Sequence, residues 1–304
     1  MHEFAVILKG TLPEYSAVQR FVNSWIRYDS GQVPIYVIVP DTARQFFADN
    51  LADRAHVIEQ SQLAPFIVSS NVDVGTADSV DEQIVILAVG ELHLARHYLW
   101  GDPEALMLRQ FDSADFFSAA GVPYAFVSEH AEARVSTNEF TNTRDAHLRN
   151  ARRILELPSA PLRTCVSMQI LSDQPLAELR DFWAGQGLTY ETALKACPDA
   201  MSWYAFWLER TGFAGAVERE PIFKDLRSEN ALVDFFLKEE TLADLARGYV
   251  GVVLDADASD LEWRRDPRTR IIAERVDSKT LVKSLCTRWL RRAPRLQRLL
   301  ARER

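Results

Sequence analysis

The most constraining feature of the sequence is the alternation of short apolar runs with amphipathic segments near its start. Residues 4–10, FAVILKG, and residues 33–40, VPIYVIVP, are predicted to be buried strands. Between them, residues 14–30 place apolar side chains three and four positions apart, which predicts a helix. Residues 41–52 follow as a second helix with Asp41 as its N-cap. Strand–helix–strand–helix order at this spacing predicts a parallel α/β sheet with right-handed crossovers.

Weaker signals extend this plan along the chain. AHVIE and FIVSS are candidates for short strands, and residues 79–97 are predicted to form one long helix with Ser79 as N-cap. HYLW and residues 122–130 are predicted to be strands, whereas helical patterns dominate beyond residue 140 until a late strand within 248–260. We therefore predict one mostly parallel α/β domain over residues 1–262 with a helix-rich C-terminal half, followed by a separate tail over 263–304.

Charge is divided unevenly between the domain and the tail. The chain carries a net charge of −8, yet residues 263–304 contain 14 Lys or Arg against 4 Asp or Glu. An acidic domain argues against nucleic-acid binding, while a basic tail favours an anionic partner. Three widely spaced cysteines suit a reducing compartment, and no apolar stretch reaches the length of a transmembrane helix. We expect a cytoplasmic protein that can associate peripherally with the inner membrane.

The tail has a basic amphipathic pattern between residues 278 and 304. Leucines recur on one face, and cationic side chains occupy the rest. One interpretation is a membrane-surface element; the other is a terminal helix that docks on the acidic domain. In the first case the residues that would contact anionic lipid are Lys283, Arg288, Trp289, Arg291 and Arg292.

Common cofactor and catalytic motifs are missing from the sequence. It has no G-x-G-x-x-G or G-x-x-x-x-G-K-[ST] loop, no G-x-S-x-G elbow and no H-E-x-x-H pair. LDADASD, with Asp255, Asp257 and Asp260, is an acidic cluster that a solvated turn explains better than a metal site does, because Asp and Ser favour turns by local hydrogen bonding. These observations give no support to dinucleotide, P-loop, serine hydrolase or zinc peptidase chemistry.

The most informative stretch is YLWGDPEALMLRQF, in which Asp102 and Glu104 flank a proline after an apolar strand. In open α/β sheets ligands bind beyond the carboxyl ends of the strands, where this pair falls. Two carboxylates on extended backbone project to the same side and could hold Mg²⁺ or Mn²⁺. Asp-Pro-Glu before ALMLRQF is equally a well-formed helix start, with Asp102 as N-cap. Both interpretations are open on local sequence.

Several blocks occur in an order that resembles a family of bacterial glycosyltransferase-like proteins, similar in plan to nucleotide-sugar transferases of the GT-A type. They are FAVILKG through VIVPD, DEQIVILAVGELHLARHYLWGDPEALMLRQF, and SWYAFWLERTGF with PIFKD. The resemblance covers roughly residues 3 to 255. It implies a GT-A-like fold, a nucleotide-sugar donor, a glycan or lipid-linked acceptor and a divalent cation, manganese or magnesium.

The resemblance also implies roles for individual residues. Asp102 and Glu104 match the acidic pair of the family, a DxD-like motif, and would hold the metal. Lys9, Asp41 and Asp102 match positions near the nucleotide-sugar site. The resemblance points to no catalytic base or nucleophile.

Other positions depart from the family pattern. Ile86 stands where a lysine is usual, Trp203 where a glutamate is usual, and Gly101 where a bulky apolar residue is usual. Glu104 replaces an aspartate, and its extra methylene moves the carboxylate by about 1.5 Å, a displacement that can cost catalysis heavily. Two functions follow as hypotheses: a metal-dependent glycosyltransferase that acts on a cell-envelope or polysaccharide acceptor, and a catalytically inactive relative that acts as a binding module at the membrane surface.

Overall fold

A five-stranded sheet in the order β3-β2-β1-β4-β8 forms the centre of the molecule. Its strands are β1 (His2–Lys9), β2 (Ile35–Val39), β3 (His56–Glu59), β4 (Ala95–Trp100) and β8 (Gln169–Ser172). The first four pair in parallel, and β8 pairs antiparallel with β4. The structure, a computed structural model, describes residues 1–63, 65–66, 80–129, 139–158, 163–165, 168–227, 235 and 241–254. The predicted, mostly parallel α/β fold is confirmed.

Alternation along the buried strands gives the sheet two apolar faces. Ala5 and Ile7 of β1 point to one face, and Val6 and Leu8 point to the other. Both sets are fully buried, as expected for a parallel sheet that is covered on both sides. The apolar runs that predicted these strands are therefore continuous rather than alternating.

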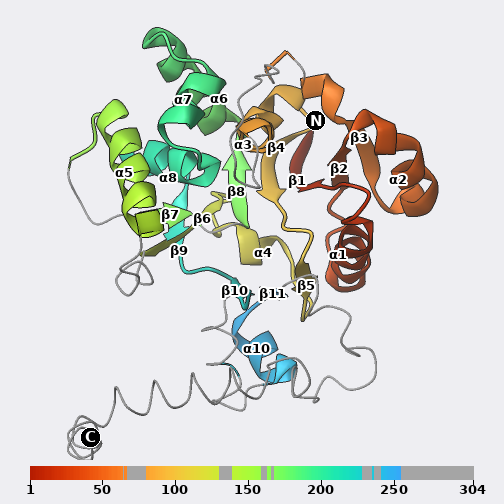
Figure 1. Cartoon of the computed structure of the whole chain (residues 1–304). Coiled ribbons are helices and arrows are strands. Elements are labelled where there is room, and N and C mark those ends of the chain that lie inside the picture. The colour runs from red at the N-terminus through yellow and green to blue at the C-terminus, as the bar shows by residue number, and fades with distance from the viewer. Residues whose placement is uncertain are drawn as a thin grey trace, which may run out of the picture.

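Helices cover the two faces from opposite sides (Figure 1). On one face lie α1 (Tyr15–Tyr28) and α2 (Arg44–Leu51), together with the short α4 (Ser113–Phe116). On the other face lie α3 (Val80–Ala88), α5 (Glu139–Ile154), α6 (Asp173–Gly185), α7 (Tyr190–Ala196) and α8 (Ala200–Arg210). Residues 200–208 of α8 are all buried, so its aromatic side chains belong to the core.

Two smaller sheets extend the molecule. One has the order β10-β11-β5 and consists of β5 (Ala105–Met107), β10 (Phe223–Asp225) and β11 (Gly251–Val253). The other has the order β7-β6-β9 and consists of β6 (Tyr124–Glu129), β7 (Arg163–Cys165) and β9 (Val217–Arg219). The first lies beyond the ends of β1 and β4, beside α10 (Leu242–Gly248) (Figure 1). The C-terminal half is thus helix-rich, as predicted, with several short strands between its helices.

The long helix predicted over residues 79–97 is wrong. Helix α3 ends at Ala88, a 3₁₀ turn follows over Val89–Leu92, and His93 adopts a left-handed conformation with φ of 48°. The chain then enters β4 at Ala95, because this segment pairs with β1 from Ala95 to Trp100 and with β8 from His97 to Trp100. Pairing with the sheet therefore overrides a local pattern that favoured a continuous helix.

The start of the second helix also differs from the prediction. Residues Asp41–Ala43 form a 3₁₀ turn, and α2 begins at Arg44. The N-cap of α2 is Ala43 and not Asp41, whose side chain accepts a hydrogen bond from the backbone N–H of Ser61 at 3.1 Å. The expected strand FIVSS lies beyond the described residues after Phe66, and the boundary at residue 262 lies beyond residue 254, so both stay predictions.

Candidate functional site

Asp102 lies directly beyond the carboxyl end of β4. The register of β1 and β4 pairs Ile7 with Trp100, so Lys9 and Asp102 each lie two residues past the last paired position. The backbone N–H of Gly101 continues the pairing by donating to the carbonyl of Ile7 at 2.8 Å. The chain thus brings a lysine and an aspartate to the same edge of the sheet, where open α/β sheets bind their ligands.

Residues 102–105 form a turn, which corrects both interpretations of this stretch. The backbone N–H of Ala105 donates to the carbonyl of Asp102 at 2.9 Å, and the N–H of Glu104 donates to Asp102 Oδ1 at 3.0 Å. The two carboxylates therefore do not lie on extended backbone. Nor does a helix follow, because Ala105–Met107 is strand β5 and pairs antiparallel with β11.

The sheet β10-β11-β5 brings Arg227 to Asp102. Asp225 and Ala105 both pair with Val253, on its two sides, so the residues after β10 lie next to the turn before β5. Arg227 Nη1 donates to Asp102 Oδ2 at 2.8 Å. The same guanidinium contacts Asp225, with Nη2 2.6 Å from its Oδ2. Sequence reasoning missed Arg227, and its only local signal is the Asp-x-Arg spacing in FKDLR.

Burial and the charge of Arg227 shift the pKa values of Asp102 and Asp225 in opposite directions. Burial raises the pKa of the Asp102 carboxyl above its usual range, although the charge of Arg227 and the hydrogen bond from Glu104 oppose the rise. For Asp225, burial also acts upward, but the hydrogen bonds and charge of Arg227 outweigh it, so the pKa is lowered. Asp225 is therefore the stronger counter-charge of Arg227, and Asp102 is the carboxylate that is harder to ionise.

The described residues at the Asp102 turn do not fit a divalent cation. Mg²⁺ can be held by one or two carboxylates and substrate phosphates, so the number of acidic residues does not decide the question. The existing contacts of the carboxylate oxygens argue against a cation here. Oδ1 of Asp102 accepts a hydrogen bond from a backbone N–H, and Oδ2 accepts one from Arg227. Within the described ranges, no three His, Cys, Asp or Glu side chains are grouped in a way that could hold a metal ion. The predicted metal ligands Asp102 and Glu104 stay a prediction that these contacts do not favour.

The other predicted nucleotide-site residues lie at the same edge of the sheet. Lys9 is the last residue of β1 and is half-buried. Asp41 is exposed and follows β2, whose residue Ile38 pairs with Lys9. Glu14, which caps the loop after β1 through hydrogen bonds from Thr11, adds negative charge near Asp102.

The positions that depart from the family pattern are part of the core. Ile86 is 6% exposed, and Trp203 is fully buried, with its Nε1–H donating to the carbonyl of Cys197 at 2.9 Å. Gly101 is required by close packing, because a Cβ there would lie 2.6 Å from Leu8 Cδ2 and 3.2 Å from Phe21 Cζ. The side chains of Ile86 and Trp203 are therefore part of the core, and Gly101 leaves room for the side chains packed against it.

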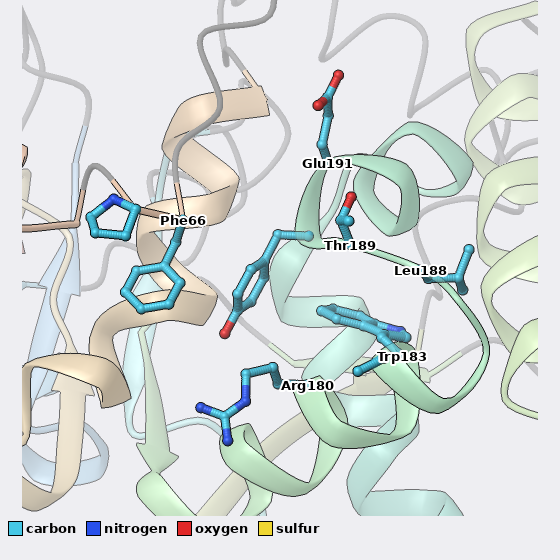
Figure 2. A pocket seen from close by; sticks show the side chains of 9 residues that line it. Phe66, Arg180, Trp183, Leu188, Thr189 and Glu191 are labelled. Carbon is cyan, nitrogen blue, oxygen red and sulfur yellow. The ribbon is translucent and has the colours of Figure 1, made fainter.

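A hollow lies between α6 and the start of α7. Its volume is about 250 Å³, and it is lined by Pro65, Phe66, Arg180, Trp183, Ala184, Leu188, Thr189, Tyr190 and Glu191. Figure 2 shows Phe66 on one side of it and Trp183 and Arg180 on the other. The ring of Tyr190 packs against both Phe66 and Trp183, with centroids 6.2 and 5.8 Å away. Arg180 forms an ion pair with Glu91. Since Glu91 precedes β4 and Asp102 follows it, the hollow and the Asp102 turn lie at opposite ends of that strand.

Several predicted residues cannot be placed. The membrane-surface candidates Lys283, Arg288, Trp289, Arg291 and Arg292 lie outside the described residues, as do Asp255, Asp257 and Asp260. In the part of the chain that the structure describes, no helix has the length and hydropathy needed to cross a bilayer.

Comparisons with known proteins give structural neighbours only. No protein-family model and no curated protein sequence matches the chain. Its structure is similar to that of mouse xyloside xylosyltransferase 1 in its apo form, with a TM-score of 0.46 and 10% identity over 84% of this chain and 98% of that chain. It is also similar to the galactosyltransferase LgtC in complex with donor and acceptor sugar analogues, with a TM-score of 0.45 and 11% identity over 86% and 90% of the two chains. An active-site mutant of LgtC gives a TM-score of 0.49 and 10% identity over 93% and 95%. The similarity concerns the overall fold.

Proposed function

We propose that the chain transfers a sugar from a nucleotide-diphosphate donor to a glycan or lipid-linked acceptor of the cell envelope or of a polysaccharide. The observation that carries the proposal is the position of Lys9, at the end of β1, and of Asp102, just beyond the end of the adjacent parallel strand β4. These are the residues that the family resemblance assigns to the donor site. The edge of an open α/β sheet is also where nucleotide ligands bind by the geometry of the fold.

Each side chain at this edge has a chemical role in the proposal. Lys9 and Arg227 carry positive charge that can stabilise the diphosphate as it leaves with the bonding electrons. Asp41 offers carboxylate oxygens as acceptors for hydroxyl groups of the donor, and Asp102 holds the Arg227 guanidinium at the donor site. A divalent cation is the expectation of the family resemblance; because the contacts of Asp102 do not favour it, no step of the proposed reaction depends on it.

A donor panel tests the proposal directly. The full chain is titrated with UDP- and GDP-sugars, with Mn²⁺ and with EDTA, and both thermal stability and release of free sugar are measured. We expect stabilisation by at least one donor, and a clear loss of that response in Lys9→Met. Lys195→Met is the matched control, because Lys195 pairs with Glu191 on the surface of α7, far from β1. No response to any donor under either condition would remove the transferase proposal.

The second hypothesis, a non-catalytic binding module, is favoured by the buried positions of Ile86 and Trp203. Polar residues that the family keeps there are replaced by core residues in this chain. Membrane association would then depend on the basic tail, which is tested by sedimentation with anionic liposomes. We expect full-length protein to sediment and a truncation at Ser278 to stay in solution. Equal and negligible binding by both forms would exclude a role at the membrane surface.

A further inference from the structure

The Asp102 turn already contains a positive charge that belongs to the protein. The Arg227 guanidinium lies 2.8 Å from Asp102 Oδ2 and 2.6 Å from Asp225 Oδ2, and it bridges two carboxylates from different elements. Asp225 also contacts the backbone of Arg227, whose N–H donates to Asp225 Oδ1 at 2.9 Å. The guanidinium is therefore fixed in place before any ligand arrives.

Bridging two acidic groups is what a divalent cation does in a nucleotide-diphosphate site. Asp102 is 12% exposed and has one carboxylate oxygen committed to Arg227 and the other to the turn. A metal ion that bound this carboxylate would have to displace the guanidinium, and it would then meet the positive charge of Arg227 a few ångströms away. Repulsion of that kind is strong at a partly buried site, where the effective dielectric constant is low.

We infer that Arg227 takes the place of the divalent cation at the Asp102 turn, so that this site works without a metal. The role of Arg227 in binding the donor rests on the proposed function. Its exclusion of a metal ion from Asp102 does not, because that requires no donor. If a nucleotide-sugar binds here, Arg227 and Lys9 are the cationic side chains at this edge that its diphosphate would meet. Arg227 is then a binding residue of the donor site that the family pattern does not assign.

The direct test measures Mn²⁺ binding to the full chain without any nucleotide, by the electron paramagnetic resonance signal of free Mn²⁺. Wild-type protein is expected to leave the signal unchanged at submillimolar Mn²⁺. Arg227→Ala is expected to bind Mn²⁺ at least about tenfold more tightly, because Asp102, Asp225 and Glu104 lose their counter-charge. Arg227→Lys keeps the charge and is expected to behave as wild type.

Arg109→Ala is a matched control. Arg109 pairs with Asp115 at 2.7 Å, with side-chain exposures of 35% and 16%, close to the 35% and 12% of Arg227 and Asp102. A gain of Mn²⁺ binding in Arg109→Ala equal to that in Arg227→Ala would overturn the inference. So would Mn²⁺ binding by wild-type protein that is as tight as that of Arg227→Ala.

A second measurement uses wild-type protein and keeps the inference testable if Arg227→Ala does not fold. The affinity for UDP and GDP is compared in EDTA and in Mn²⁺ by calorimetry. Equal affinities support the inference, and binding that requires Mn²⁺ overturns it. If neither nucleotide binds under either condition and the donor panel is also silent, the proposed function fails, while Mn²⁺ binding to the wild-type chain still decides whether Arg227 excludes the metal.

Discussion

Gly251 controls the sheet that holds Arg227 against Asp102, and Gly251→Ala tests this arrangement. A Cβ at this position would lie 2.8 Å from the carbonyl oxygen of Leu106 in β5 and 2.8 Å from Cδ1 of Phe223 in β10. Ordinary contacts begin near 3.4 Å, so the backbone of β5 and the ring of Phe223 must each move by about 0.6 Å. Overpacking of this kind costs about 1–3 kcal/mol. The smaller entropy of the unfolded alanine chain returns about 0.4–1 kcal/mol.

We therefore expect Gly251→Ala to lower the free energy of unfolding by about 1–2 kcal/mol. The assay is urea denaturation followed by tryptophan fluorescence. Gly185→Ala is the control, because nothing lies within 4 Å of a Cβ at this helical position in α6. It is expected to gain about 0.5–1 kcal/mol. A Gly251→Ala variant as stable as wild type, beside a control that behaves as expected, would show that the three short strands do not pack as described.

Two further substitutions test the buried charges. Glu209→Ala is expected to cost about 3–5 kcal/mol in urea denaturation, because it leaves Arg152, only 5% exposed, without the carboxylate that it contacts at 2.6 Å. Glu156→Ala, which removes a 69% exposed carboxylate, is expected to cost about 0–1 kcal/mol, and equal losses would contradict the reasoning. Burial lowers the pKa of His97, so its contribution to stability is present above pH 6.5 and is lost as the pH falls through the lowered pKa. His97→Gln is expected to remove that part of the pH dependence; an unchanged stability profile below pH 6.5 would show that His97 is not its source.

Strong local patterns made much of the main sheet predictable. The apolar runs at β1 and β2 and the spacing of Val18, Phe21 and Trp25 in α1 report burial directly, and the structure confirms these elements. Residues 79–97 failed because their apolar character suits a helix and a buried strand alike. Only the pairing of Ala95–Trp100 with its neighbours separates the two, and that information lies elsewhere in the chain.

The sequence was sufficient to predict where the candidate site lies in the fold, but not which side chains contact one another there. The order of elements was enough to locate Lys9 and Asp102 at the carboxyl ends of neighbouring strands. ALMLRQF was compatible with a helix start, yet Ala105–Met107 is a strand because it pairs with Gly251–Val253. The contact between Asp102 and Arg227 joins residues 125 positions apart, so no local spacing could indicate it.

The sheet β10-β11-β5 consists of three strands of three residues each, drawn from positions 105 to 253 of the chain. Closing loops of this length costs entropy before the strands gain their few hydrogen bonds. We expect such a unit to form late in folding and to open at a lower free energy than the long parallel pairs of β1, β2 and β4. Transient opening would separate Arg227 from Asp102 while the central sheet stays intact, and amide hydrogen exchange would register it first at these nine residues. The charge balance of the Asp102 turn is thus governed by one of the least cooperative parts of the fold.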